Sequence, residues 1–220
     1  MENISWFGHA SFAITDSLNG NRIYFIDPFE LPSDNSDKAD LIFVTHAHYD
    51  HLSEGDINHI LKPDAIVIAT PDSLATLKIV NEQKFEVTPN NSYEVKGTKF
   101  ETIPAYNVRP ERLNFHPKLN NWVGYILFVN NQKIYHAGDT DFIPEMQNFP
   151  CKSLDIAMLP MGGKYTMEVE EMIEAANAIK AKITIPMHYR RLLGNKSSDS
   201  EQKLQQGVTN SKVVILEEIS

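Results

Sequence analysis

The sequence reads Leu41-Ile42-Phe43-Val44-Thr45-His46-Ala47-His48-Tyr49-Asp50-His51 within its first quarter. The first four residues form an apolar run of the kind found in buried strands, and three histidines and one aspartate follow within six positions. Because side chains alternate along a strand, His46 and His48 can point to the same side, and the turn that follows can bring Asp50 and His51 to a second position beside them. Imidazole and carboxylate groups are ligands that Zn²⁺, Mn²⁺ and Fe²⁺ accept, and burying them without a partner is costly. The pattern therefore predicts a metal site at the end of a strand, whereas the alternative is a polar loop that is rich in histidine by chance.

The composition limits the classes of protein that fit. With 220 residues and 42% hydrophobic residues, the chain is long enough for one large domain or two small ones. We expect no signal peptide, no membrane span and a cytoplasmic protein, and the single cysteine, Cys151, excludes an internal disulfide. The net charge of −9 opposes binding to nucleic acid or to an anionic membrane surface. A local basic groove is the alternative, and its candidate residues are Arg109, Arg112, Lys118, Arg190 and Arg191.

The hydrophobic pattern predicts many strands and few helices. Strands are expected at residues 4–7, 22–27, 41–45, 65–69, 85–88, 93–95, 100–103, 123–129, 133–136, 155–159, 182–186 and 212–216. Helical spacing predicts helices at residues 73–81, 167–180 and 200–206. Strand-rich halves with intervening helices fit two sheets packed together with helices outside.

Two more candidate ligands follow predicted strands. Asp139 comes after an apolar strand and Gly138, where the backbone turns sharply, and His188 comes after the run Ile183-Thr184-Ile185 and Pro186. A carboxylate such as Asp139 can bridge two metal ions. On spacing alone, Asp139 is equally well explained as an ordinary aspartate in a turn after glycine, and a lone histidine in the position of His188 is more often a core or surface residue.

Several segments together resemble one family. They are the H-x-H-x-D-H run with Gly8-His9-Ala10-Ser11-Phe12, Asp27-Pro28-Phe29, Tyr135-His136-Ala137-Gly138-Asp139-Thr140 and Ile185-Pro186-Met187-His188-Tyr189. In this order they resemble the metallo-β-lactamase superfamily and, within it, the ascorbate-lactonase-like branch of predicted metal-dependent hydrolases. The resemblance covers residues 4–189. It implies an α/β fold, a four-layered αββα sandwich of two mixed β-sheets flanked by helices, with residues 1–220 as a single hydrolase domain and the metal site at one edge between the sheets.

The resemblance also implies how the ligands divide between two ions. His46 and His48 would hold the first ion, Asp50, His51 and His188 the second, and Asp139 would bridge them. Relatives usually place another histidine after a Pro-Ala-x segment, where this chain has Asn107, a poor ligand for zinc. We therefore expect a long loop to bring His116 to the first ion. If it does not, the first ion is weakly bound or missing and one ion remains.

The other three histidines are His9, His59 and His136. His9 lies in a turn between two strands, where it can orient a metal ligand, contact the substrate or protonate the leaving group, for which Tyr189 is the alternative. His136 is expected to form a hydrogen bond inside the sheet, and His59 is expected to be structural.

The ligands predict the chemistry. Two divalent ions, zinc with manganese or iron as alternatives, would share a hydroxide that attacks a small ester, lactone or phosphodiester, with Asp50 also orienting this nucleophile. The expected partner is a small-molecule substrate, without nucleic acid or membrane. The competing classes are a nuclease of the same fold, a redox protein that holds iron with the same ligands, and a non-catalytic metal-binding protein. The sequence leaves the substrate, the native metal and the oligomeric state open.

Overall fold

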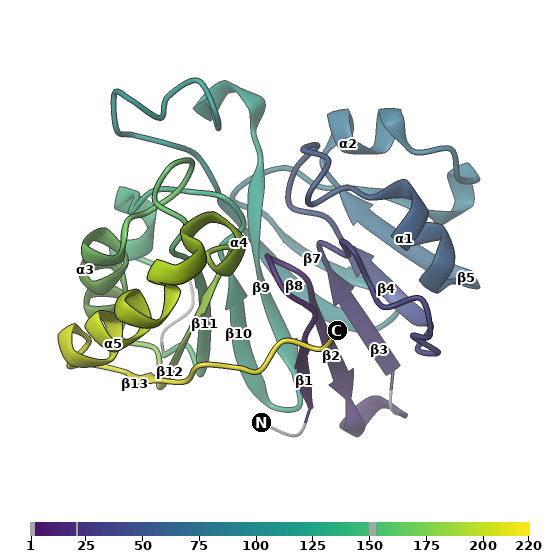
Figure 1. The fold of residues 1–220 in the computed structure, drawn as a ribbon. Helices are drawn as coiled ribbons and strands as arrows, with labels where there is room; N and C mark the ends of the chain where they lie inside the picture. Colours follow the sequence, from purple (N-terminus) through teal and green to yellow (C-terminus); the bar gives the residue numbers. More distant parts are fainter. Residues whose placement is uncertain (1–2, 21, 150–152) are drawn as a thin grey trace. The chain divides into compact units, whose positions relative to one another are not determined.

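The computed structural model consists of two units, each of which contains one mixed β-sheet (Figure 1). Unit 1 comprises Met1–Thr88 and Glu217–Ser220, and unit 2 comprises Pro89–Leu216. The structure describes residues 3–20, 22–149 and 153–220, so that Cys151 lies outside the described residues. The predicted α/β class with two mixed sheets and helices is confirmed. The prediction of a single domain stays a prediction.

The sheet of unit 1 has six strands in the order of the sequence. They are β1 (Ile4–Trp6), β2 (Phe12–Asp16), β3 (Arg22–Ile26), β4 (Ala39–Phe43), β5 (Leu61–Ala69) and β6 (Lys84–Glu86). The pairs β1–β2 and β2–β3 are antiparallel, whereas the three pairs from β3 to β6 are parallel. Parallel strands end at the same edge of a sheet, so the residues after β3 and β4 are brought together there.

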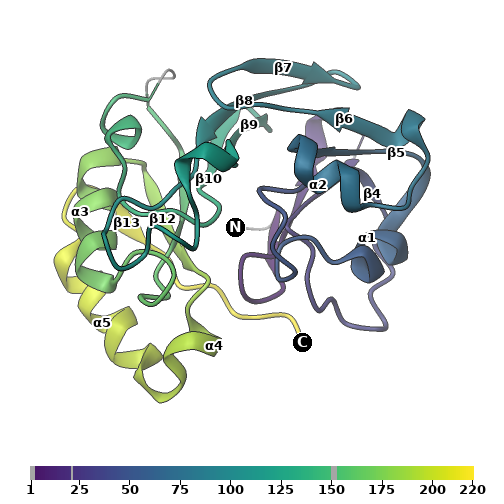
Figure 2. The same cartoon turned by 90° about the horizontal axis from the view of Figure 1, so that it is seen from above.

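Two helices cover this sheet next to β4 and β5 (Figure 2). Helix α1 (Glu54–Ile60) begins where the side chain of Ser53 accepts a hydrogen bond from the backbone of Asp56 at 3.3 Å. Helix α2 (Pro71–Thr76) has proline in its first turn, where the missing N–H costs nothing. Both helices bury apolar residues against Ile42, Val44 and Val67 of the sheet region.

The sheet of unit 2 has seven strands. In spatial order they are β13 (Lys212–Val213), β12 (Ile183–Met187), β11 (Ile156–Pro160), β10 (Gln132–His136), β9 (Val123–Val129), β8 (Thr98–Pro104) and β7 (Ser92–Val95). The strands from β7 to β10 pair antiparallel and those from β10 to β13 pair parallel. Asn130 and Asn131 form the tight turn between β9 and β10, with φ angles of 52° and 59°.

Helices α3 (Val169–Ile179) and α5 (Ser197–Gly207) lie side by side in unit 2 (Figures 1 and 2), and α4 (Arg190–Leu193) is a single turn. Five short 3₁₀ helices complete the described elements: η1 (Ser17–Asn19), η2 (Asn81–Gln83), η3 (Lys118–Asn120), η4 (Pro144–Gln147) and η5 (Gly194–Lys196). Within the described residues, no helix combines the length and apolar composition that crossing a membrane requires.

The helix predicted for residues 73–81 is wrong in its second half. The structure ends α2 at Thr76, and Leu77 is already extended. The ammonium group of Lys84 donates hydrogen bonds to the carbonyl oxygens of Leu74 and Leu77 at 2.9 and 2.8 Å, so these carbonyls need no further helical turn. Strand β2 was not predicted, because Phe12, Ala13 and Ile14 are all buried and their pattern does not alternate. The last strand is shorter than predicted, since only Lys212–Val213 pairs with β12.

Candidate metal centre

Unit 1 gathers the predicted ligands in the turn between β4 and α1. The backbone N–H groups of His51 and Leu52 both donate to the carbonyl oxygen of His48, which closes this turn tightly. Nε2 of His46 lies 3.0 Å from Nδ1 of His48. One ligand atom each from His9, Asp50 and His51 lies within 4.8 Å of the others. The turn after β4 thus brings the histidines of the H-x-H-x-D-H run close to one another and to Asp50.

Asp27 holds this turn from the end of the neighbouring strand β3. Its carboxylate is fully buried and accepts hydrogen bonds from the backbone N–H of Thr45 at 2.7 Å, the hydroxyl of Thr45 at 2.7 Å and Nδ1 of His51 at 2.8 Å. An ionised carboxylate only accepts, so all three partners must donate. Asp27 therefore fixes the position of the strand end and of the His51 ring.

These bonds determine where two imidazoles carry their protons. His51 donates from Nδ1, so a neutral ring leaves a lone pair on Nε2. The hydroxyl of Thr45 gives its proton to Asp27 and must accept from Nδ1 of His46, 2.9 Å away. His46 therefore also has its lone pair on Nε2. Both rings are in the tautomer that ligates a metal through Nε2.

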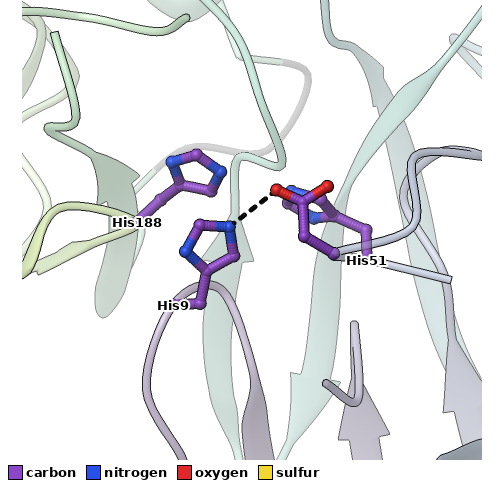
Figure 3. A group of neighbouring side chains, drawn as sticks. His9, His51 and His188 are labelled. Atoms are coloured by element: carbon purple, nitrogen blue, oxygen red, sulfur yellow. Dashed lines mark hydrogen bonds and ion pairs between the residues drawn. The ribbon is translucent and has the colours of Figure 1, made fainter. Parts of the chain in front are cut away.

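His9 supports Asp50 from a strained turn. Its Nε2 lies 2.9 Å from Oδ2 of Asp50, and because a carboxylate only accepts, Nε2 donates. Figure 3 draws this contact as the dashed line from His9. The indole N–H of Trp6 donates to the carbonyl oxygen of His9 at 3.1 Å and holds the turn. Gly8 has φ of +90°, and a Cβ there would lie 2.3 Å from a carboxylate oxygen of Glu218, so only glycine fits. This geometry agrees with the alternative in which His9 orients a ligand.

In unit 2, two predicted histidine ligands lie next to one oxygen of a third predicted ligand, Asp139. Oδ2 of Asp139 lies 3.3 Å from Nε2 of His116 and 3.1 Å from Nε2 of His188, and all three residues are buried. Asp139 follows Gly138, whose φ of +64° makes the sharp turn after β10. The backbone N–H of Gly138 donates to Nδ1 of His136 at 3.2 Å, so His136 supports this turn through a hydrogen bond next to the strand end.

The side chain of Asn107 contacts both the backbone and the ring of His116. Its amide oxygen accepts from the backbone N–H of His116 at 3.0 Å and faces Nδ1 of the ring at 2.8 Å. Its amide nitrogen donates to Asp141 at 3.0 Å and to the carbonyl oxygen of Tyr165 at 3.1 Å. The predicted loop thus does bring His116 beside Asp139, whereas Asn107 contacts His116 from the opposite side of the ring.

The loop that carries His116 is fixed by a buried charge network. Asp141 accepts from the backbone N–H groups of Val108 and Arg109 at 2.8 and 2.9 Å. Arg112 is 4% exposed and forms ion pairs with Asp141 and Glu171. The hypothesis of a basic binding groove is therefore wrong for Arg112, because its charge is buried and compensated inside the unit.

Two further members of that hypothetical groove have acidic partners. Lys118 lies 3.3 Å from Glu145 and 2.9 Å from the hydroxyl of Tyr106, and Arg190 lies 3.4 Å from Glu201. The bond to Tyr106 raises the pKa of Lys118. The charges of Lys118 and Arg190 are therefore partly compensated by neighbouring carboxylates.

His188 needs a glycine beside it. It has φ of +55°, and a Cβ on Gly162 would lie 2.5 Å from its carbonyl oxygen. The neighbouring Tyr189 is buried and donates from its hydroxyl to Glu201, and burial raises the pKa of Tyr189. Tyr189 is therefore a poor proton donor, which leaves His9 as the candidate for protonating the leaving group.

His59 is exposed in the last turn of α1, where its ring contacts the carbonyl oxygen of Asn35 at 3.1 Å, in agreement with a structural role.

The donor set fits divalent metal ions. In a neutral His116, Nε2 has a lone pair that faces a carboxylate oxygen, and two such atoms repel unless a cation or proton lies between them. Two tetrahedral zinc ligands with bonds of about 2.0–2.1 Å lie about 3.3 Å apart, close to the separations of 3.0 to 3.3 Å within each cluster. His9, Asp27 and His188 also have positive φ angles, a strain that concentrates at functional sites.

The ligand-type residues are recognisable in the sequence, whereas the residues that hold them in place are not. Asp27 lies in one of the family-like segments without an evident role, and nothing local to Thr45, Asn107 or Asp141 indicates a positioning function. The signal for Asp27 was present, since it follows β3 directly and parallel neighbours end at one edge.

The comparisons with known proteins agree with this fold and these residues. A protein-family model described as "Beta-lactamase superfamily domain" matches residues 3–188. A UPF0173 metal-dependent hydrolase from Thermoplasma acidophilum is 33% identical over 227 residues, which cover 99% of this chain and 97% of the relative. Another from Pyrococcus furiosus is 32% identical, covering 98% of this chain and 96% of the relative. The crystal structure of a candidate metal-dependent hydrolase from Parabacteroides distasonis has a TM-score of 0.85 and 31% identity, covering 98% of this chain and 93% of that one.

Fold and comparisons together define the class, which is that of the metal-dependent hydrolases with a metallo-β-lactamase fold. The chain belongs to the β-lactamase superfamily, as the sequence motifs predicted. Its membership of the ascorbate-lactonase-like branch stays a prediction.

Proposed function

We propose that this metal-dependent hydrolase uses two divalent ions, zinc in the first instance, to hydrolyse a small ester, lactone or phosphodiester. The proposed ligand set is the one that the sequence predicts: His46, His48, Asp50, His51, His116, Asp139 and His188. Asp139 is proposed as the bridging ligand, because two imidazole nitrogens approach the same oxygen of its carboxylate. When bound, the ions would lower the pKa of a shared water towards neutrality and polarise the oxygen that gains charge.

The observation that carries this proposal is the state of three imidazoles. In each of three rings, Nδ1 faces an oxygen that accepts a hydrogen bond from it. These acceptors are the hydroxyl of Thr45 for His46, Asp27 for His51 and Asn107 for His116. Each ring is thereby held with its lone pair on Nε2, the form a metal ligand needs. A non-catalytic packing role would not require the same proton position at three separate rings.

The other residues have supporting roles in this proposal. Asp50 accepts from His9, so its carboxylate is held in one orientation in which it can ligate an ion and align the attacking water. His9 already donates to Asp50 and can pass a proton to a leaving group only if this bond is exchanged. Asp27 keeps His51 in place and excludes the opposite tautomer.

A small molecule is the proposed substrate. Tyr49 lies between His48 and Asp50 in the sequence, and its ring is 78% exposed. It meets Phe29 edge-on at 6.0 Å, and Phe29 in turn contacts the ring of His9 at 5.8 Å. This aromatic surface beside the polar cluster suits the apolar part of a small substrate. The buried or paired state of Arg112, Lys118 and Arg190 argues against a nuclease.

The test is metal content with a matched pair of variants. Elemental analysis of protein purified without chelator should find about two ions per chain, and a panel of lactones, esters and phosphodiesters should reveal hydrolysis that depends on them. Asp139→Ala should bind fewer than two ions and lose hydrolysis, whereas Asp199→Ala, on the exposed first turn of α5, should keep both. Full metal content and full hydrolysis in Asp139→Ala would refute the bridging role. At most one ion per chain after incubation with each metal would refute the dinuclear proposal.

A further inference from the structure

We infer that Asn107 is a positioning residue that sets the tautomer and orientation of His116. It occupies the position at which relatives usually have a histidine, so the sequence alone presents it as a broken metal ligand. The structure instead shows a buried amide, 2% exposed, whose oxygen and nitrogen both have partners. This inference rests on the proposed function in one respect, namely that His116 is a ligand.

The orientation of the Asn107 amide is determined by its partners. Its nitrogen lies 3.0 Å from a carboxylate oxygen of Asp141 and 3.1 Å from the carbonyl oxygen of Tyr165, and both of these atoms only accept. Exchanging the amide nitrogen and oxygen would bring two acceptors together at each contact. The oxygen must therefore face His116.

The oxygen of Asn107 receives two bonds from one residue. The backbone N–H of His116 donates to it at 3.0 Å, and Nδ1 of the ring lies 2.8 Å away. Since an amide oxygen only accepts, Nδ1 must carry the proton. The neutral ring then has its lone pair on Nε2, the atom 3.3 Å from Asp139.

The backbone of Asn107 also helps to close the loop. The backbone N–H of Asn107 donates to the carbonyl oxygen of His116 at 2.9 Å, so the two residues are joined at three points. Asp141 fixes the amide from the other side and is held by Arg112. The amide nitrogen of Asn107 donates two hydrogen bonds and its amide oxygen accepts two. An imidazole cannot make all four bonds. Asn107 is therefore suited to support a ligand and not to replace one.

The direct test is the proton position on His116. Long-range ¹H–¹⁵N spectra distinguish Nδ1–H from Nε2–H imidazoles, and His116→Gln assigns the signal among the eight histidines. In the wild-type protein we expect the Nδ1–H form with zinc bound, and the same form after zinc is removed with a chelator at mildly alkaline pH. In Asn107→Leu without zinc, we expect the preference for this form to be lost. An Nε2–H ring in the zinc-free wild type would overturn the inference.

Zinc affinity provides the second measurement. Removing a hydrogen-bond partner of a ligating histidine typically weakens metal binding about 10- to 100-fold, and we expect Asn107→Leu to show a loss in this range. Asn114→Leu changes an exposed residue of the same loop and should leave the affinity unchanged. Equal affinity of Asn107→Leu and the wild type would contradict the positioning role. If Asn107→Leu does not fold, the spectra of the wild-type protein alone decide.

The two proposals fail in different ways. Wild-type protein that binds none of zinc, manganese and iron but keeps the Nδ1–H form would refute the proposed function and support the role of Asn107. Wild-type protein that binds two ions but has a zinc-free His116 in the Nε2–H form would support the function and refute the role of Asn107.

Discussion

Replacing Asp27 by asparagine should destabilise unit 1 and impair metal binding, although the two side chains have nearly the same shape. Asp27 is fully buried and accepts three hydrogen bonds of 2.7, 2.7 and 2.8 Å. An asparagine offers one accepting oxygen and one donating nitrogen to these three donors, so at least one contact becomes donor against donor. The nitrogen fits best opposite His51, because this ring can move its proton from Nδ1 to Nε2. That shift removes the lone pair with which His51 would bind a metal ion.

The magnitude follows from the three bonds. A hydrogen bond to a charged group contributes about 1.5–3 kcal/mol, and a neutral one about 0.5–1.5 kcal/mol. Losing the charge at all three contacts is partly offset, because a buried carboxylate no longer has to be desolvated. We expect the free energy of unfolding to fall by about 2–4 kcal/mol, with a loss of zinc affinity of about 10- to 100-fold.

Urea unfolding at unchanged m-value measures the first quantity, and zinc competition measures the second. Asp40→Asn is the matched control in the same sheet, since Asp40 accepts from the backbone of Ile23 at 2.9 Å and from Lys62 at 2.8 Å near the surface. It should cost less than about 1 kcal/mol and leave zinc affinity unchanged. If Asp27→Asn unfolds like the wild type, binds zinc equally well and keeps His51 protonated on Nδ1, the reasoning about this turn is wrong.

Three further predictions test the packing of the chain. Arg112→Met should lower the free energy of unfolding by about 3–5 kcal/mol in urea titrations, because it leaves the buried carboxylates that Arg112 pairs with uncompensated, and a loss below about 1 kcal/mol would contradict this account. Gly162→Ala should lower the free energy of unfolding by about 1–3 kcal/mol and weaken zinc binding, because its Cβ would meet the backbone of His188. Gly55→Ala has open space around it in α1 and should raise the free energy of unfolding by about 0.5–1 kcal/mol. The same sign for both substitutions would refute this explanation. Burial raises the pKa of Tyr135 above its ordinary value of 10.0, so the folded state favours the neutral phenol, and its contribution to stability is complete below pH 10.0 and is lost as the pH rises further. Tyr135→Phe should therefore reduce the alkaline loss of unfolding free energy by about 1.4 kcal/mol per pH unit, and an unchanged slope would show that Tyr135 does not titrate with unfolding.

The local pattern was enough to predict most of the sheet strands. Val123–Val129 was predicted with the bounds that β9 has, because a long apolar run with an Asn-Asn turn after it allows few other structures. Residues 73–81 show the limit of this reasoning. Their helical spacing is real, but Lys84 satisfies the carbonyls at the end of α2 from outside the segment, and the sequence pattern within the window does not contain that contact.

The candidate site divides in the same way. The residue types that can hold a metal were visible in the sequence, because three histidines and an aspartate within six positions are rare and follow an apolar strand. The role of Asn107 was not visible, since its meaning depends on Asp141 and Tyr165, which lie 34 and 58 positions away in the chain. Arg112 was considered as a surface cation for the same reason, because Glu171, one of its partners, is 59 positions away in the chain.

The sequence by itself thus determined the family, the strand pattern and the chemical types of the ligands, because each of these is encoded in short stretches through periodicity and spacing. Only the tertiary structure decided which groups hold the ligands in place, such as Asp27 beneath His51 and Asn107 beneath His116. The physical reason is that a proton's position on an imidazole ring is set by the acceptor that faces it, and folding brings that acceptor from a distant part of the chain.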